Sequence, residues 1–342
     1  MRLLAQENVL TYSETRHMLS FKRNTQNREP EREMDAVVIE RFGAINVMKT
    51  VRRRIPQPQN GEVLVRVKAI GVSPVDCRIR AGVGLSRHYS GFPVTPGFDV
   101  AGVVEEVARQ ATKFQPGDEV MGMVNFPAPA GGYAAFVACS QDELVRKPES
   151  VTFEDAAALP LSGLTAWQAL FVHGRLKRAA RVLIHAGAGG VGHIAVQLAK
   201  RHGATVVATA SSRNHHFLQS LGADEVIDYG ITAFEEAAGD VDLILDGVGG
   251  ETQERSLSIL RRAGVMVSLA STVNGDREAA SMRIKRMLVR PDLSQLEALT
   301  ALLESRELKV AVTTVPSLHD IHQAHGLCES AHVRGKVVVL TE

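Results

Sequence analysis

The chain has 342 residues, which at roughly 100–200 residues per domain predicts two domains. Hydrophobic residues make up 45% and charged residues 23%, the profile of a soluble globular protein. A net charge of +1 without a clustered basic face argues against a nucleic-acid partner, and no apolar run approaches the ~20 residues of a membrane-spanning helix.

Residues 1–33 mix both charge signs with short apolar pieces and lack the three regions of a signal peptide. We expect a poorly ordered extension there, with a docked helix over "LTYSETRHMLSF" as the alternative. The cysteines Cys77, Cys139 and Cys328 form no C-x-x-C pair, so we expect reduced, buried thiols in a cytoplasmic protein.

Short strand patterns dominate residues 34–155. The stretch "GEVLVRVKAIGV" alternates apolar and polar residues, which predicts a half-buried strand. Further short strands are predicted over "DAVVIERFG", "FDVAGVVEEVA", "GDEVMGMV", "GGYAAFVACS" and "ELVRKP". Together they predict a small barrel-like β domain.

The pattern changes over residues 156–300. A helix is predicted over "EDAAALPLSGLTAWQALF", interrupted near Pro160 and Gly163. Strands and helices then alternate: "RVLIHA", the helix from Val191, "TVVATA", "RNHHFLQSLG", "EVIDY", "VDLILDGVG" and "VMVSLAS". Near-continuous apolar strands between helices predict a doubly wound parallel sheet, so the fold class is α/β.

The last segment, residues 301–342, begins within the predicted amphipathic helix "SQLEALTALLESREL". It holds "VAVTTVP", "LHDIHQAHGLCES" and "KVVVL". These elements are expected either to extend the parallel sheet or to return to the first domain.

A G-x-G-x-x-G motif, "GAGGVG", stands between a predicted strand and a predicted helix. In this context Gly187 is expected to allow a tight turn, Gly189 to admit a pyrophosphate, and Gly192 to let helix and strand pack closely. The helix N-terminus would then hold the pyrophosphate. A strand–turn–helix without a ligand is the alternative.

About 20 residues after the glycines, NAD-binding proteins place an acid that bonds the ribose hydroxyl. Here the region holds Ser211, Ser212 and Arg213 and no acid. Hydroxyls and a guanidinium bind a 2′-phosphate through charge-assisted bonds, so we predict NADP(H) as the cofactor. A solvated charge at a helix start is the alternative for Arg213.

Ordered motifs then reveal a resemblance that covers residues 34–340. They are "GVSPVDCRIRAG", "PVTPGFDVAGVVEEV", "FQPGDEVMG", "GGYAAFV", "LPLSGLTAWQALF", "VLIHAGAGGVG", "LGADEVIDY", "VDLILDGVGGET" and "ESAHVRGKVVV". The chain resembles the medium-chain dehydrogenase/reductase superfamily, in its zinc-independent quinone oxidoreductase branch. The resemblance implies a GroES-like catalytic domain, a Rossmann domain and a chain end that returns to the catalytic domain.

Zinc ligands are missing from the positions that carry them in alcohol dehydrogenase relatives. The resemblance places Ser73-Pro74 where those relatives have a Cys-His pair, and Phe98-Asp99 where they have His-Glu. A zinc site needs about three protein ligands of the Cys, His or carboxylate type. We therefore predict no metal, and we expect His319, His322 and His325 to form a solvated helix face.

Catalytic and cofactor residues follow from the resemblance. The predicted catalytic residues are Ser73 and Tyr89; Asp76 and Tyr133 are weaker candidates, better explained by a turn and by packing. Beyond the glycines and the Ser-Ser-Arg run, the expected cofactor contacts are Thr165, Ala188, Gly190, Val191, Tyr229, Asp246, Gly247, Leu269, Ala270 and Lys336. The lysine matches a family lysine that approaches phosphate or ribose.

The predicted function is the transfer of hydride from NADPH to a quinone or an α,β-unsaturated carbonyl. One alternative is a reductase of enoyl thioesters or of other activated alkenes. The alternative from another class is an NADPH-binding sensor or structural protein with little turnover. The resemblance also implies a homodimer formed through the edges of the cofactor-domain sheets.

Overall fold

The computed structural model describes residues 32–89, 91–270 and 283–341. Contacts divide the chain into Met1–Arg32 and Glu33–Glu342. The expected extension over 1–33, like its docked-helix alternative, lies outside the described residues except for Arg32 and Glu33. Within the described ranges, no helix is both long and apolar enough to cross a membrane.

The first half of the compact unit is built on a mixed sheet of seven strands with the order β14-β15-β3-β4-β5-β7, with β6 paired to β3. The strands β14 (Val312–Val315) and β15 (Lys336–Leu340) come from the end of the chain. Its early strands are β3 (Glu62–Val72), β4 (Asp99–Val107), β5 (Glu119–Met123), β6 (Phe136–Ser140) and β7 (Leu144–Arg146). The strand β3 was expected to be half-buried, but both of its faces are mostly covered. Helix α2 (Phe153–Ala158) packs against it.

Two early elements escaped the sequence patterns. The strand β2 (Met48–Arg54) pairs antiparallel with β1 (Glu33–Ile39), and its arginine-rich end is exposed. Helix α1 (Pro74–Arg80) begins at a proline, where the missing N–H costs nothing. Its Asp76 carboxylate accepts a hydrogen bond from the Ser73 backbone N–H, at 2.8 Å between N and Oδ2.

The predicted interruption at Gly163 is wrong. Pro160 does divide the segment, because α2 ends and α3 (Pro160–Trp167) begins there; a π-helical turn, Gln168–His173, follows. Gly163 lies inside α3, where a Cβ atom would come within 3.0 Å of the Leu299 side chain. The glycine therefore allows close packing against helix α8 (Leu293–Glu304) rather than a break.

The second half is a parallel six-stranded sheet with the order β10-β9-β8-β11-β12-β13. The strands are β8 (Arg181–Ile184), β9 (Thr205–Ala210), β10 (Glu225–Asp228), β11 (Val241–Asp246), β12 (Leu260–Ser268) and β13 (Ile284–Arg286). The helices between them are α4 (Gly192–His202), α5 (His215–Ser220), α6 (Phe234–Ala237) and α7 (Gly250–Ser256). This is the doubly wound order, and its reversal between β8 and β11 marks the edge where ligands bind.

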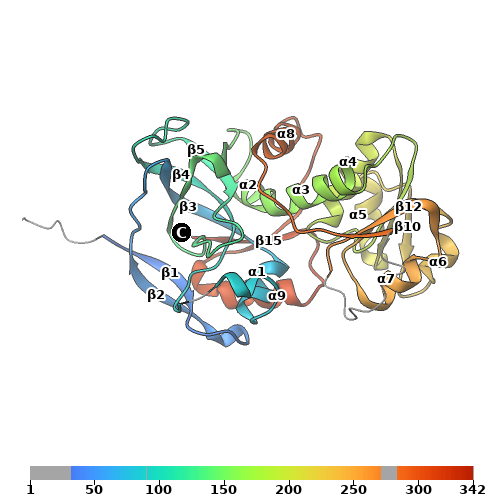
Figure 1. Ribbon diagram of the computed structural model, residues 1–342, viewed down its shortest axis with the longest axis horizontal. Coiled ribbons are helices and arrows are strands. Elements are labelled where there is room, and N and C mark those ends of the chain that lie inside the picture. The colour runs from blue at the N-terminus through green and yellow to red at the C-terminus, as the bar shows by residue number, and fades with distance from the viewer. Residues whose placement is uncertain (1–31, 90, 271–282, 342) are drawn as a thin grey trace, which may run out of the picture. The chain divides into compact units, whose positions relative to one another are not determined.

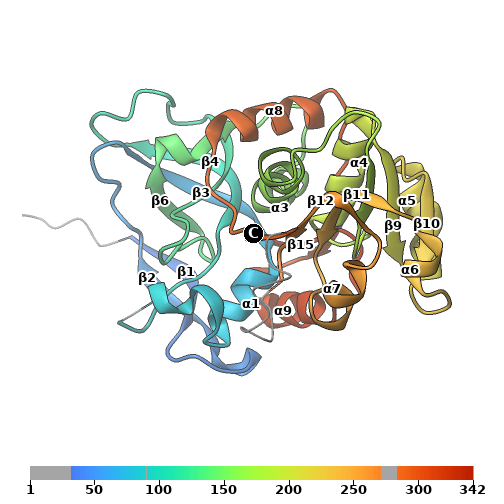
Figure 2. The same ribbon diagram turned by 45° about the vertical axis from the view of Figure 1, so that its right-hand side comes forward.

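The end of the chain returns to the first sheet. Strand β14 (Val312–Val315) pairs with β15 (Lys336–Leu340), and β15 pairs antiparallel with β3, with Val337 opposite Val72. Figures 1 and 2 show β15, drawn in red, beside the blue β3. Helix α9 (Ile321–Glu329) packs against β15 and α1. The first residue of β15 is therefore held between the two sheets.

Candidate functional site

A cavity of about 900 Å³ lies at the carboxyl ends of the parallel strands, the size of a cofactor and small-ligand site. One wall is made by residues that follow β8, β11 and β12, and the other by the start of α1 and the start of β15. Four cationic side chains line it, namely Arg78, Arg87, Arg286 and Lys336, and no carboxylate is among its described lining residues. Such a lining suits an anionic ligand.

The glycine loop fits a dinucleotide, although its turn differs from the expectation. Ala186, not Gly187, takes the left-handed conformation, with φ of +51°. Gly187 is required because a Cβ there would lie 2.9 Å from the Ala208 Cβ on β9, and Gly192 because a Cβ would lie 2.3 Å from the Ala186 carbonyl oxygen. Gly189 lines the cavity, and a Cβ there would meet only the Ala186 oxygen at 3.2 Å. The space in front of Gly189 therefore remains open for a phosphate.

The loop is tied to the end of the chain. The Gly335 N–H donates to the Ala188 carbonyl at 2.8 Å, so Ala188 holds the loop by its backbone and does not line the cavity. His193 bonds the Gly189 carbonyl through Nδ1 at 2.8 Å and accepts the Ala311 N–H at Nε2. Burial lowers the pKa of His193 to about 4, so the imidazole is neutral and can make both bonds.

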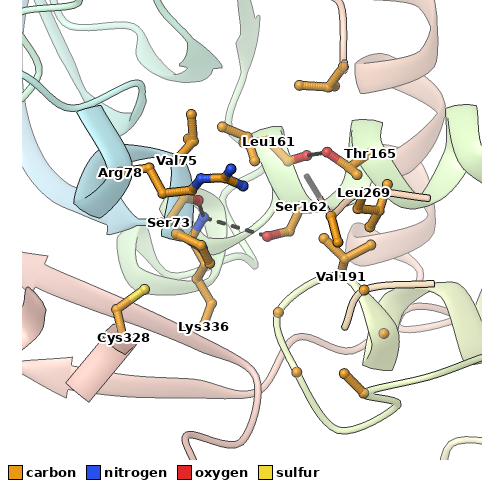
Figure 3. Close-up of a pocket in the computed structure, with 18 of the residues that line it drawn as sticks. Ser73, Val75, Arg78, Leu161, Ser162, Thr165, Val191, Leu269, Cys328 and Lys336 are labelled. Atoms are coloured by element: carbon orange, nitrogen blue, oxygen red, sulfur yellow. Dashed lines mark hydrogen bonds between the residues drawn. The ribbon is translucent and has the colours of Figure 1, made fainter. Parts of the chain in front are cut away.

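Most of the predicted contacts near the nicotinamide position do line the cavity. These are Thr165, Gly190, Val191, Gly247, Leu269 and Ala270. The Thr165 hydroxyl donates to the Leu161 carbonyl at 2.6 Å, which orients it within α3 (Figure 3). Asp246 is different: it is buried and does not line the cavity.

The Asp246 carboxylate is already occupied by the protein. It accepts the N–H groups of Val248 at 2.9 Å and Gly249 at 2.8 Å, and the Gln253 side-chain amide at 2.7 Å. The cofactor contact predicted for Asp246 is therefore not supported; the residue fixes the turn after β11. Its neighbour Gly247 does line the cavity.

The predicted 2′-phosphate residues lie just after β9, and the structure adds one that the sequence did not indicate. Arg334 donates to Asn214 Oδ1 at 3.1 Å and to the Arg213 carbonyl at 3.2 Å, and its guanidinium stacks on the Phe217 ring. Arg213 donates to the His332 carbonyl at 3.1 Å. Two arginines that are 121 residues apart in sequence are therefore neighbours, each donating to a backbone carbonyl of the other's segment.

The neighbouring serines are less available. The pKa of the half-buried Asp228 is lowered by hydrogen bonds from the Gly230 backbone N–H and from Ser212. The Ser211 hydroxyl accepts the Asn214 side-chain amide at 3.3 Å. Tyr229 is exposed and, like the two serines and the two arginines, does not line the cavity. The two arginines are the stronger candidates for phosphate contact because their guanidinium groups are charged.

Lys336 is the centre of a buried cluster between the sheets. Its ammonium is 2.6 Å from Asp99 Oδ2, contacts Ser73 Oγ, and lies 3.5 Å from Ser162 Oγ. We call Lys336, Asp99, Ser73 and Ser162 the lysine cluster. Figure 3 shows the lysine, Ser73 and Ser162 turned toward one another. These three line the cavity, and Lys336 is committed to this cluster rather than free to reach a phosphate.

The lysine cluster does not fit a zinc ion. Ser73 and Asp99 stand at two of the positions that carry ligands in alcohol dehydrogenase relatives, and an ammonium lies between them. A cation at that point would repel Zn²⁺, and Phe98, at the histidine position, is a buried ring without a lone pair. Among the described residues, no group of three or more His, Cys, Asp or Glu side chains is arranged to hold a metal.

The other proposed donors point elsewhere. Tyr89 is buried outside the cavity lining, and its hydroxyl donates to the Ala128 carbonyl at 3.2 Å. Tyr133 is fully buried and lies 3.0 Å from His325 Nε2. Burial raises the pKa of Asp76 to about 7, although the Ser73 N–H opposes this shift. Among the four candidates only Ser73 lines the cavity.

The expected solvated face is correct for His319 and His322, which are exposed, and wrong for His325. His325 is fully buried, because α9 turns it toward Tyr133 and toward the buried guanidinium of Arg80. The Arg80 guanidinium also pairs with Glu329. Burial lowers the pKa of His325 to about 3. His322 bonds the Met48 carbonyl at 3.1 Å, and His319 is exposed.

Family models match two parts of the chain. A model described as "Alcohol dehydrogenase GroES-like domain" matches residues 59–149, and one described as "Zinc-binding dehydrogenase" matches residues 221–339. The sequence is 31% identical to the Danio rerio "NAD(P)H oxidoreductase RTN4IP1, mitochondrial", over 90% of this chain and 91% of that protein. It is 30% identical to the Spinacia oleracea "Quinone-oxidoreductase homolog, chloroplastic", over 87% and 95%.

Solved structures agree with these relatives. The quinone oxidoreductase from Coxiella burnetii superposes with a TM-score of 0.86 at 36% identity, over 91% of this chain and 100% of that one. The Escherichia coli quinone oxidoreductase complexed with NADPH gives a TM-score of 0.80 at 28% identity, over 90% and 99%.

Proposed function

Since the chain belongs to the quinone oxidoreductase branch of the medium-chain dehydrogenase/reductase superfamily, a family of NAD(P)H oxidoreductases, we propose that it reduces quinones or α,β-unsaturated carbonyls with NADPH and without zinc. The observation that carries this proposal is the cavity at the switch point. An open glycine loop forms one wall, and a buried ammonium with a serine hydroxyl forms the other.

NADPH, when bound, supplies the hydride. The residues that would hold it are the glycine loop, Thr165, Gly247, Leu269 and Ala270. The two arginines Arg213 and Arg334 support a preference for NADPH, because charge-assisted bonds to a 2′-phosphate are about twice as strong as neutral ones. The apolar part of the cavity, which includes Val75, Leu85 and Phe126, excludes water and orients a flat acceptor.

A quinone or an enone needs little activation, because most of its electrophilicity is intrinsic. This chemistry suits a site that has a hydroxyl and an ammonium in place of a divalent cation. A reductase of enoyl thioesters is the second candidate, since the cationic lining suits a phosphorylated carrier. A cofactor-binding sensor is the candidate from another class.

The decisive experiment follows NADPH oxidation by the purified protein with a panel of quinones, enones and one enoyl thioester. Oxidation with a quinone or enone supports the proposal, and oxidation with the thioester alone selects the second candidate. Tight NADPH binding by calorimetry without oxidation of any panel member would favour the sensor. The proposed homodimer is tested separately by light scattering.

A further inference from the structure

The lysine cluster is buried but open to the cavity on one side. Lys336 is 3% exposed and Asp99 is 1% exposed, yet Ser73, Ser162 and Lys336 all line the cavity. Four separate elements bring the cluster together: the start of β15, the start of β4, the residue before α1, and α3. Burying a charged pair is costly, so such a cluster is a candidate for chemistry rather than for stability.

The glycine loop fixes the position of this lysine. Gly335 bonds Ala188 of the loop, and Lys336 bonds the Ala311 carbonyl through its own N–H at 2.8 Å. A Cβ built on Gly190 of the loop would lie 3.4 Å from Ser162 Oγ and 3.8 Å from the Lys336 side chain. The lysine cluster therefore adjoins the loop that would hold the cofactor.

The hydrogen bonds leave one proton available to a ligand. An ammonium has three donors and no acceptor, so Ser73 Oγ must accept the bond from Lys336. The Ser73 hydroxyl proton then finds no acceptor among the described residues. Because Ser73 lines the cavity, its O–H can donate to an oxygen of a bound molecule (Figure 3).

We propose that Ser73 and Lys336 form the proton source of the reaction, with Ser73 as the catalytic residue and Lys336 as a positioning residue that acts through it. This inference rests on the proposed function. It replaces the metal of the alcohol dehydrogenase relatives with a proton relay.

With an enone as acceptor, hydride transfer is coupled to proton transfer from Ser73. As hydride reaches the β-carbon, the electrons of the C=C bond move to the carbonyl oxygen. The Ser73 O–H bond breaks and that oxygen gains the proton, while a Lys336 N–H bond breaks and restores the Ser73 hydroxyl. Lys336 is left as a neutral amine beside Asp99, and it takes a proton from solvent after the product leaves. For a quinone, hydride reaches one carbonyl oxygen, the electron pair moves through the ring to the other oxygen, and that oxygen takes the Ser73 proton to give the hydroquinone.

Positioned acids of this kind contribute about 10²–10⁴-fold in rate. We therefore expect Lys336→Met and Ser73→Ala each to lower the rate of NADPH oxidation by about 10²-fold or more with an enone. Lys336→Arg should not restore the rate, because a guanidinium keeps its charge but does not release a proton.

Two further variants separate the relay from stability. Lys147 is a matched control, since it is a second buried lysine, 4% exposed at its side chain and paired with Glu119 at 2.7 Å, and it lies outside the cavity lining. Lys147→Met should lower stability and leave the rate per folded molecule unchanged. If Lys336→Met does not fold, the double variant Lys336→Met with Asp99→Asn removes both buried charges and retains an acceptor for the Leu161 N–H.

A binding measurement tests the donor pair without turnover. The probe is 4-nitrophenol, titrated by absorbance in the presence of NADP⁺, because its phenolate imitates the oxygen that gains charge. Wild type should bind the phenolate about 10- to 100-fold more tightly than does Lys336→Met, with neutral phenol little affected. Equal phenolate binding by the two proteins, or an unchanged enone rate in the double variant, would overturn the inference. Failure of the wild type to oxidise NADPH with any acceptor would instead refute the proposed function. The phenolate titration would still test whether Ser73 and Lys336 stabilise a negatively charged oxygen.

Discussion

The two arginines at the adenosine end give the most direct test of cofactor choice. Arg334 is held by two hydrogen bonds and by the Phe217 ring, whose centroid is 4.8 Å from the guanidinium carbon. Neither Arg213 nor Arg334 forms an ion pair with a carboxylate in the described part of the chain, so both charges can meet a 2′-phosphate. A hydrogen bond to a charged group is worth about 1.5–3 kcal/mol, or roughly 10–150-fold in Kd.

Solvent weakens this contribution, because both side chains are exposed. We therefore expect Arg213→Ala and Arg334→Ala each to raise the Kd of NADPH about tenfold and to leave the Kd of NADH within about twofold. The double variant should raise the Kd of NADPH by less than the product of the two single effects, since the two neighbouring arginines would contact one phosphate group.

The assay is calorimetry with both cofactors at one ionic strength, because salt screens exposed charges. The matched control is Arg261→Ala, an exposed arginine of the same sheet that is paired with Asp242 at 2.8 Å. Its loss should not alter selectivity. If Arg213→Ala and Arg334→Ala weaken NADH as much as NADPH, the phosphate assignment is refuted.

Three further predictions concern the loop, the buried histidine and the metal. Gly335→Ala should lower the thermal unfolding midpoint and weaken NADPH binding, because φ is +70° and the new Cβ would lie 1.9 Å from the Ala311 oxygen. The control is Gly61→Ala, which has φ of +83° but nothing within 4 Å of the new Cβ and therefore measures the backbone strain alone. Equal losses in thermal midpoint for the two variants would contradict the steric overlap at Gly335. His325→Gln should lower the free energy of unfolding at neutral pH. The difference in this free energy between wild type and variant should shrink by about 2 kcal/mol between pH 6.5 and 5. The pKa of His325 in the folded protein, about 3, lies below the ordinary 6.5, so the wild-type stability falls as the pH drops through this window and the stability of the variant does not. A difference in unfolding free energy that stays constant with pH in denaturant titrations would count against a neutral imidazole. Treatment with a chelator should leave the rate of NADPH oxidation unchanged. A loss of activity that added zinc restores would contradict the proposal that the Lys336 ammonium stands in place of the metal.

The fold was largely predictable because its signals are local. Hydrophobic runs bounded by glycine and proline located β9 at Thr205–Ala210 and the start of α3 at Pro160. Elements without such a signal were missed. β2 reads as a basic segment, because its exposed arginines hide the pairing with β1.

The site was predictable only in part, because sequence motifs identify residues and not their partners. Ser73, Asp99 and Lys336 were each singled out, but nothing in the sequence indicates that residues separated by 237 and 263 positions share hydrogen bonds. For the same reason the sequence did not indicate Arg334, which lies beside Arg213 because the residues before β15 bond the glycine loop through Gly335. Asp246 was misread because a carboxylate at a strand end can serve the turn instead of the ligand.

An ammonium in place of a metal ion restricts the acceptors that the proposed site can reduce. Coulomb energy scales with charge over distance, so a doubly charged zinc at about 2.0 Å from an oxygen polarises it roughly threefold more strongly than a singly charged donor at about 2.8 Å. An alcohol or a simple ketone needs the stronger field, because its C–O bond carries no conjugated acceptor. A quinone or an enone already delocalises the incoming electron pair, and it needs only an oxygen partner and a proton. In the mechanism proposed above, the lysine cluster supplies both through Ser73. On that proposal the missing zinc changes which acceptors the site can reduce, while the parallel sheet and its glycine loop remain suited to the same hydride donor.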